Sequence, residues 1–167
     1  DFTGWNENFN PKDETFYTFN NKNTWLVDSN GKKTKMGGYS VKAIVEDKNG
    51  DLLIGTWSSG LLRLHRGSHT FLRYPVLNSM NSAYSLFFDS KQRLWVGTWG
   101  YGVIRLDNPG DVRNPKIYKY PYKTNHFDIF YKITEDPVTH TLWACTREGV
   151  CYIYESQLDN GWQMHTM

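Results

Sequence analysis

Short apolar runs separated by turn residues follow one another along most of the chain, and no helical period extends far enough to indicate a helix. The pattern of residues 47–64 returns at residues 89–106, where Gly97 matches Gly55 at a constant offset of 42 residues. A period of about 40–45 residues built from short strands is typical of a β-propeller blade. The pattern therefore predicts an all-β chain, a β-propeller fragment made of four-stranded antiparallel blades.

A third, more diverged copy follows, with Cys145 at the position of Gly55 and Gly97. Apolar positions agree between the copies, and these shared positions predict strands that are covered on both faces by neighbouring blades. We expect blades at residues 39–76, 82–122 and 127–167. The expected strands, from the innermost outward, are 40–46, 52–56, 61–65 and 70–74 in the first copy, 83–88, 94–98, 103–107 and 116–120 in the second, and 129–135, 142–146, 150–154 and 162–165 in the third.

The N-terminal region lacks the repeated residues. We expect residues 1–20 to form the third and fourth strands of a preceding blade, and residues 21–38 a connecting loop with an extra hairpin at Asn30-Gly31, a strong turn signal. The chain would then hold three whole blades and half of another. Because propellers need about 4–8 blades to protect their edges, we expect a segment of a longer ring whose remaining blades are its partners.

The charge balance argues against nucleic acid as a partner, and the hydropathy argues against a membrane-spanning helix. The 167 residues include 19 basic and 17 acidic side chains, for a net charge of +2, and this nearly neutral balance gives no basic surface for nucleic acid. The longest apolar runs are only a few residues, which predicts no membrane-spanning helix.

The repeated residues resemble the two-component regulator propeller repeat, whose core reads Asp-x-x-Gly-x-Leu-Trp-Ile-Gly-Thr followed by a short loop and Gly-Gly-Leu. The resemblance covers about residues 39–154. It departs from the repeat at Leu53, where Trp is usual, at residues 91–93, which lack the turn glycine, and at Cys145. The matching residues are Asp47, Gly50, Leu52, Gly55, Thr56 and Gly60, then Asp89, Leu94, Trp95, Gly97, Thr98 and Gly102.

That resemblance implies a function. Such repeats are known from the periplasmic sensor regions of bacterial hybrid two-component histidine kinases, which are anchored in the inner membrane. It implies that this segment binds a glycan breakdown product, or docks a neighbouring propeller, to control signalling by a homodimeric receptor. It implies no cofactor, and any kinase activity would lie elsewhere in the parent chain. Alternatives are a propeller-type polysaccharide lyase or hydrolase fragment and an intracellular WD-type scaffold, the latter disfavoured because the Gly-His and Trp-Asp signatures are missing.

The loops expected on one face of the propeller supply candidate ligand-binding residues. Aromatic side chains beside amides and an arginine suit a sugar, since its ring needs flat apolar faces and its hydroxyls need fixed polar groups. Two of these aromatics occupy equivalent positions and could instead pack between adjacent blades, whereas Tyr101 and Arg147 break the repeat. The candidates are Trp57, Trp99, Tyr101, Arg147, Asn81 and His126.

Acids, histidines and cysteines give no catalytic or metal site. Asp47, Asp89 and Asp136 fall at a turn where Asp binds its own backbone, on the face opposite the aromatic loops. The five histidines have no metal-ligand spacing. With a three-residue loop between their strands, Cys145 and Cys151 would face each other across the hairpin, so a disulfide and two free thiols are both compatible with the sequence.

Overall fold

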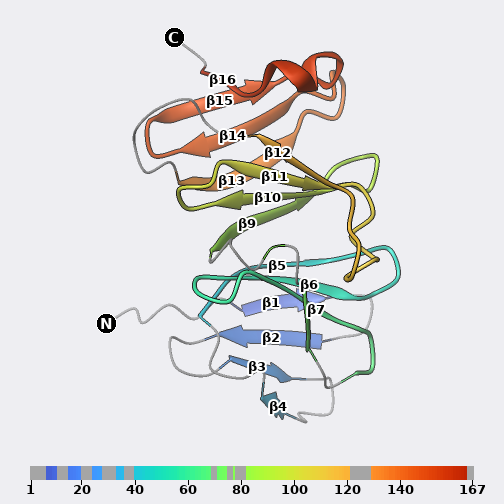
Figure 1. Ribbon diagram of the computed structural model, residues 1–167. Coiled ribbons are helices and arrows are strands. Elements are labelled where there is room, and N and C mark those ends of the chain that lie inside the picture. The colour runs from blue at the N-terminus through green and yellow to red at the C-terminus, as the bar shows by residue number, and fades with distance from the viewer. Residues whose placement is uncertain are drawn as a thin grey trace.

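Within the described part of the chain, four antiparallel sheets of four strands each follow one another in chain order (Figure 1). The computed structural model describes residues 7–10, 15–19, 24–27, 33–35, 40–68, 71–74, 77, 82–120 and 129–164. In every sheet, strands that are consecutive in sequence lie side by side, the up-and-down order of a propeller blade. The expected all-β propeller fold is therefore confirmed.

The first sheet differs from the expectation. Residues 1–20 were expected to form the outer half of a blade, but their strands β1 and β2 pair with two further strands in the order β1-β2-β3-β4. The expected extra hairpin is the second half of this same sheet. The prediction of a half blade was wrong because no repeated Asp or Gly-Thr marks a strand's position here. The bounds are β1 Glu7–Asn10, β2 Thr15–Phe19, β3 Thr24–Val27 and β4 Lys33–Lys35.

The second, third and fourth sheets agree closely with the expected strands. The innermost strand of each is β5, β9 or β13, and the later strands follow outward. The bounds are β5 Val41–Glu46, β6 Leu52–Thr56, β7 Leu61–Leu64 and β8 Phe71–Arg73; β9 Ala83–Phe88, β10 Leu94–Thr98, β11 Val103–Leu106 and β12 Ile117–Tyr120; β13 Phe130–Glu135, β14 Leu142–Thr146, β15 Gly149–Ile153 and β16 Gln163–Met164, with a 3₁₀ helix η2 at Glu155–Asn160 before the last.

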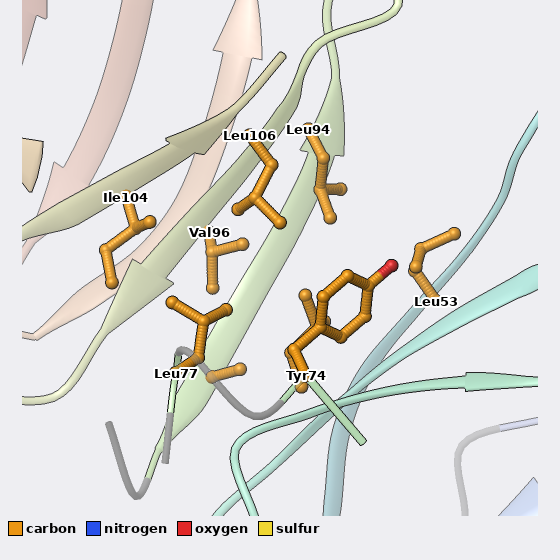
Figure 2. Packing of buried hydrophobic residues seen from close by; sticks show 9 residues of the cluster. Leu53, Tyr74, Leu77, Leu94, Val96, Ile104 and Leu106 are labelled. Atoms are coloured by element: carbon orange, nitrogen blue, oxygen red, sulfur yellow. The ribbon is translucent and has the colours of Figure 1, made fainter. Parts of the chain in front are cut away.

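Side-chain alternation along the second strand of each sheet builds the core. Leu53 of β6 belongs to the same buried cluster as Leu94 and Val96 of β10 in the third sheet, and Figure 2 shows the ring of Tyr74 between Leu53 and Val96. On the opposite face of β10, Trp95 packs against Phe130 and the rest of the fourth sheet. Leu53 and Trp95 are both completely buried. Strands buried on both faces explain why these segments read as continuous apolar runs.

Two repeated glycines allow the second strand of one sheet to approach the inner strand of the next sheet. A Cβ atom at Gly55 would lie 2.6 Å from the carbonyl oxygen of Ala83 on β9, and one at Gly97 would lie 2.9 Å from that of Phe130 on β13. Both distances are shorter than real contacts, so only glycine fits. The inner strands follow one another as well, since β9 contacts both β5 and β13.

Candidate functional site

Equivalent turns present the two expected tryptophans. Trp57 and Trp99 directly follow Thr56 and Thr98, whose buried hydroxyls donate to the carbonyl oxygens of Gly60 at 2.8 Å and Gly102 at 2.7 Å. The same hydroxyls accept backbone N–H groups from within the loop. The repeated threonine therefore fixes the loop geometry, and each tryptophan leaves the sheet at the same end.

Trp57 and Trp99 contact each other across neighbouring sheets and still face solvent. Their ring centroids lie 4.7 Å apart with an interplanar angle of 85°, an edge-to-face pair. Trp57 is 39% exposed and Tyr101 is 52% exposed. A cavity of about 380 Å³ is lined by Trp57, Ser58, Ser82, Trp99 and Tyr101. The repeated tryptophans were expected either to pack between adjacent blades or to line a ligand site. In the structure the pair does both, since it joins two sheets and also lines a cavity.

A β-bulge occurs at the same position in each of the three inner strands. In β5 the register shifts between Val41 and Ala43, and the residue in the bulge is Lys42. The corresponding shifts in β9 and β13 leave Tyr84 and Tyr131 in the bulge. A bulge re-aims the side chain of its extra residue. The start of each inner strand pairs with the last residue of the following strand, which is Thr56, Thr98 or Thr146. The bulges therefore lie at the end of the sheets from which the Trp57 and Trp99 loops emerge.

The bulge residues extend the tryptophan pair into a larger surface. Tyr84 lies 6.4 Å from Trp57, 6.2 Å from Trp99 and 5.8 Å from Tyr131, between ring centroids. Tyr131 is 45% exposed. We call Trp57, Tyr84, Trp99, Tyr101 and Tyr131 the aromatic surface. Three sheets contribute to it.

Polar groups accompany the aromatic surface. The hydroxyl of Ser82, a buried residue, accepts the backbone N–H of Trp99 at 3.0 Å, which ties the loop to the start of β9. The ammonium of Lys42 lies 5.6 Å from the ring centroid of Trp57 and 5.8 Å from that of Tyr84. Both distances are within the range of cation–π attraction. The described residues of this surface therefore offer aromatic faces, hydroxyls and a cation.

The structure does not bring every predicted residue to this cavity. Arg147 follows Thr146 just as the tryptophans follow their threonines, so it lies at the same end of the fourth sheet, exposed in the turn with Glu148. It does not line the cavity. Asn81 and His126 lie outside the described residues.

Sequence reasoning missed Ser82, Lys42, Tyr84 and Tyr131. The three bulge residues align with one another when the copies are superimposed on their shared apolar residues. The position holds Lys in the first copy and Tyr in the other two, and large polar or aromatic residues at the same place of an inner strand are the signal that would have found them. Their direction could not be read from strand alternation, because a bulge interrupts it.

The repeated aspartates hold turns, as expected. Asp47 accepts the backbone N–H groups of Asn49 at 2.8 Å and Asp51 at 3.0 Å, while Asp89 and Asp136 accept equivalent bonds in their own turns. These turns close the ends of the sheets opposite the tryptophan loops, since they join the end of each inner strand to the next strand. Backbone hydrogen bonds from Thr139 and Val138 lower the pKa of Asp136.

The disulfide hypothesis is contradicted. The loop between β14 and β15 has two residues, not three, so Cys145 pairs with Val150 and Cys151 pairs with Ala144. A register change of one residue turns a side chain to the other face of a sheet. Cys145 is accordingly exposed and Cys151 buried, and no disulfide joins them.

The described part of the chain holds no candidate metal site and no helix suited to span a membrane. Its histidines, cysteines and acids form no group of three or more that could hold a metal ion. Among the helices described, none combines the length and apolar character needed to cross a membrane.

Comparison with known proteins supports the repeat assignment. Residues 35–58 and 77–100 match the family model described as two component regulator propeller. These matches include Trp57 and Trp99. None of the curated proteins matches the chain in sequence.

Solved structures share the fold. The extracellular domain of the putative hybrid two component system BT4673 from B. thetaiotaomicron superimposes with a TM-score of 0.69 and 20% identity, over 91% of this chain and 21% of that one. The corresponding domain of BT3049 from the same organism gives 0.62 and 22%, over 83% and 18%. Virginiamycin B lyase from Staphylococcus aureus gives 0.68 and 16%, over 91% and 52%. The chain thus spans about a fifth of the hybrid-system domains.

Proposed function

We propose that this chain, whose repeats match the two component regulator propeller model, is part of the periplasmic sensor of a hybrid two-component system and binds a glycan breakdown product at the aromatic surface. The observation that carries the proposal is the Trp57–Trp99 pair, which stays accessible beside a cavity although it joins two sheets. Solved structures of the same fold that are extracellular domains of hybrid two-component systems support the sensor role and its location outside the cytoplasm.

The chemistry of the surface suits a saccharide. One face of a pyranose ring is lined by C–H groups and packs on an aromatic ring, while its hydroxyls need donors and acceptors at the edge. Trp57 and Tyr101 supply exposed rings, and Ser58 and Ser82 supply hydroxyls in the same cavity. Its volume of about 380 Å³ is within the range of about 300–1,000 Å³ common for small-molecule sites.

Further blades of the parent propeller are the proposed partners at the fourth sheet. Trp143 on β14 takes the position of Leu53 and Trp95, both of which are covered by a following sheet. Here Trp143 is only partly buried and continues into a row of rings, with Tyr152 at 5.4 Å and Tyr154 a further 5.2 Å away. Another sheet packed on this face would bury the row of rings, as the third sheet covers Leu53 and the fourth sheet covers Trp95. In the full receptor we place this propeller in a homodimer anchored in the inner membrane.

An enzyme is the second candidate, because virginiamycin B lyase shares the fold. A lyase or hydrolase acting on a polysaccharide needs a base or a pair of carboxylates beside the bound sugar. The cavity beside the tryptophans is lined by aromatic and serine residues, and the described turn aspartates lie at the opposite ends of the sheets. This arrangement favours binding without turnover.

One experiment separates the two candidates. The purified chain is applied to an array of oligosaccharides from plant, microbial and animal polysaccharides, and each bound glycan is then incubated with the protein and analysed for products by mass spectrometry. The sensor proposal expects binding that leaves the glycan intact. Release of shortened or unsaturated products would overturn it in favour of the enzyme, and the lack of binding to any glycan would overturn carbohydrate recognition.

A further inference from the structure

The bulge position of the inner strands carries a lysine in one sheet and tyrosines in the next two. Lys42, Tyr84 and Tyr131 are the three residues concerned. Residues that repeat identically hold the scaffold, whereas those that differ at one accessible position are free to set specificity. Lys42 is therefore the member that changes the charge of the aromatic surface.

The ammonium of Lys42 lies within reach of both rings next to the cavity. It is 5.6 Å from the centroid of Trp57 and 5.8 Å from that of Tyr84. Attraction to two ring faces holds a flexible side chain over the surface without neutralising its charge. The residue itself is exposed, so its N–H groups remain available to a ligand.

No carboxylate balances this charge within the described part of the chain. Neither an ion pair nor a hydrogen bond joins Lys42 to a described acid, and the residues lining the neighbouring cavity are all neutral. The turn acids, of which Asp47 follows β5 itself, lie at the other end of the sheets. Arg147, at the corresponding turn of the fourth sheet, does not line this cavity. Among the described residues, the cation in contact with the rings of the aromatic surface is therefore Lys42.

We propose that the aromatic surface takes a saccharide that bears an anionic group, a carboxylate or a sulfate ester, and that Lys42 binds this group. The inference rests on the proposed carbohydrate recognition and names the class of ligand. A sugar stacked on Trp57 places substituents at the ring edge close to the ammonium, and a charge-assisted hydrogen bond to an anion is about twice as strong as a neutral one. A neutral sugar leaves the ammonium without this partner.

The test uses oligosaccharides in matched pairs. Acidic glycans that bear uronic acids or sulfates are compared with their carboxyl-reduced or desulfated forms by isothermal titration calorimetry against the purified chain. The two kinds of acid distinguish carboxylate from sulfate recognition. We expect removal of the anionic group to weaken binding about tenfold, and binding of the acidic form to weaken as salt is raised.

Variants assign the effect to Lys42. Lys42→Met should weaken binding of the acidic glycan about tenfold and leave the neutral form unchanged, while Lys42→Arg should retain the preference. Lys48→Met is the matched control, because it removes the same charge from an exposed residue in the turn at the far end of the same strand. It should leave both affinities unchanged.

The outcomes separate the two proposals. Equal affinity for the acidic and neutral forms, or an equal loss for both in Lys42→Met, would overturn the anionic-ligand inference and leave carbohydrate recognition intact. The same holds if Lys48→Met reproduces the loss, because the effect would then be one of net charge. Absence of binding to every glycan, acidic or neutral, would overturn the proposed function and the inference with it.

Discussion

The guanidinium of Arg63 in the second sheet donates a 2.8 Å hydrogen bond to the carbonyl oxygen of Pro109 in the third. The same side chain, 2% exposed, forms ion pairs of 2.7 Å with Asp47 and with Asp51. Tyr74 donates a second hydrogen bond to the Pro109 oxygen, and burial raises the pKa of this tyrosine to about 12, so its hydroxyl keeps its proton. One arginine thus joins two aspartates of its own sheet to the backbone of the next.

Loss of Arg63 should destabilise the chain strongly. Arg63→Met removes the guanidinium that two nearly buried carboxylates share, and breaking a buried pair in this way costs about 3–5 kcal/mol. Urea unfolding followed by tryptophan fluorescence measures the change in the free energy of unfolding. Arg113→Met, which removes an exposed arginine, is the control and should change it by less than about 0.5 kcal/mol. Equal free energies of unfolding for the two variants would contradict this stabilising role of Arg63.

A methyl group at Gly97 should separate the third and fourth sheets. Its Cβ would lie 2.9 Å from the carbonyl oxygen of Phe130, and inserting an atom into a packed interior costs about 1–3 kcal/mol. Thermal unfolding of Gly97→Ala should show the loss. Gly110→Ala is the control, because a Cβ there meets nothing nearer than 4.0 Å. If both variants unfold at the wild-type temperature, close approach at Gly97 does not hold the sheets.

Acid should weaken the contact between the third sheet and the helix η2. Partial burial alone would raise the pKa of Glu155, but hydrogen bonds and ion pairs with Arg93 and Lys91 outweigh it and lower the pKa. The folded chain then binds this proton less readily than the unfolded chain. The stabilisation is complete above the ordinary value of 4.5 and is lost as the pH falls through the lowered value.

Glu155→Gln removes this titration. Unfolding temperatures measured from pH 7 down to pH 3 should therefore fall less steeply below about pH 4.5 in the variant than in the wild type. The variant should also be less stable at pH 7, where the ion pairs are fully formed. Parallel pH profiles of the two proteins would contradict this role for Glu155.

The two cysteines should react at very different rates. Cys145 is exposed, whereas Cys151 is completely buried in the core between the third and fourth sheets. A thiol reagent such as 5,5′-dithiobis(2-nitrobenzoate) should label one thiol rapidly in the native chain and the second only after denaturation. Cys145→Ser should abolish the rapid phase. If no thiol reacts before reduction, even in the denatured chain, a disulfide between Cys145 and Cys151 would be indicated instead.

Repetition made much of this fold predictable. Three copies of one pattern fixed the strands of the second, third and fourth sheets, with β6, β9, β10 and β14 recovered at their observed bounds. The first sheet was misread because its strands carry no repeated residue. The cysteines were misplaced because a loop shorter by one residue reverses the face of every later side chain.

The site was only partly predictable for a related reason. Trp57, Trp99 and Tyr101 were found because loops after a repeated Gly-Thr must emerge at one end of their sheets. Their neighbours Tyr84 and Tyr131 were missed because their direction depends on a bulge, a feature of pairing between strands that the alternation of a single strand does not reveal.

The most direct test of the central claim is a calorimetric titration of Trp57→Ala and Trp99→Ala with the glycan that binds the wild-type chain most tightly. Each variant removes one ring of the aromatic surface and should weaken binding at least about tenfold, or 1.4 kcal/mol. Tyr154→Ala, which removes an exposed ring at the opposite end of the fourth sheet, should bind as the wild type does. Wild-type affinity in both tryptophan variants, with their fold intact by circular dichroism, would contradict carbohydrate recognition at this surface.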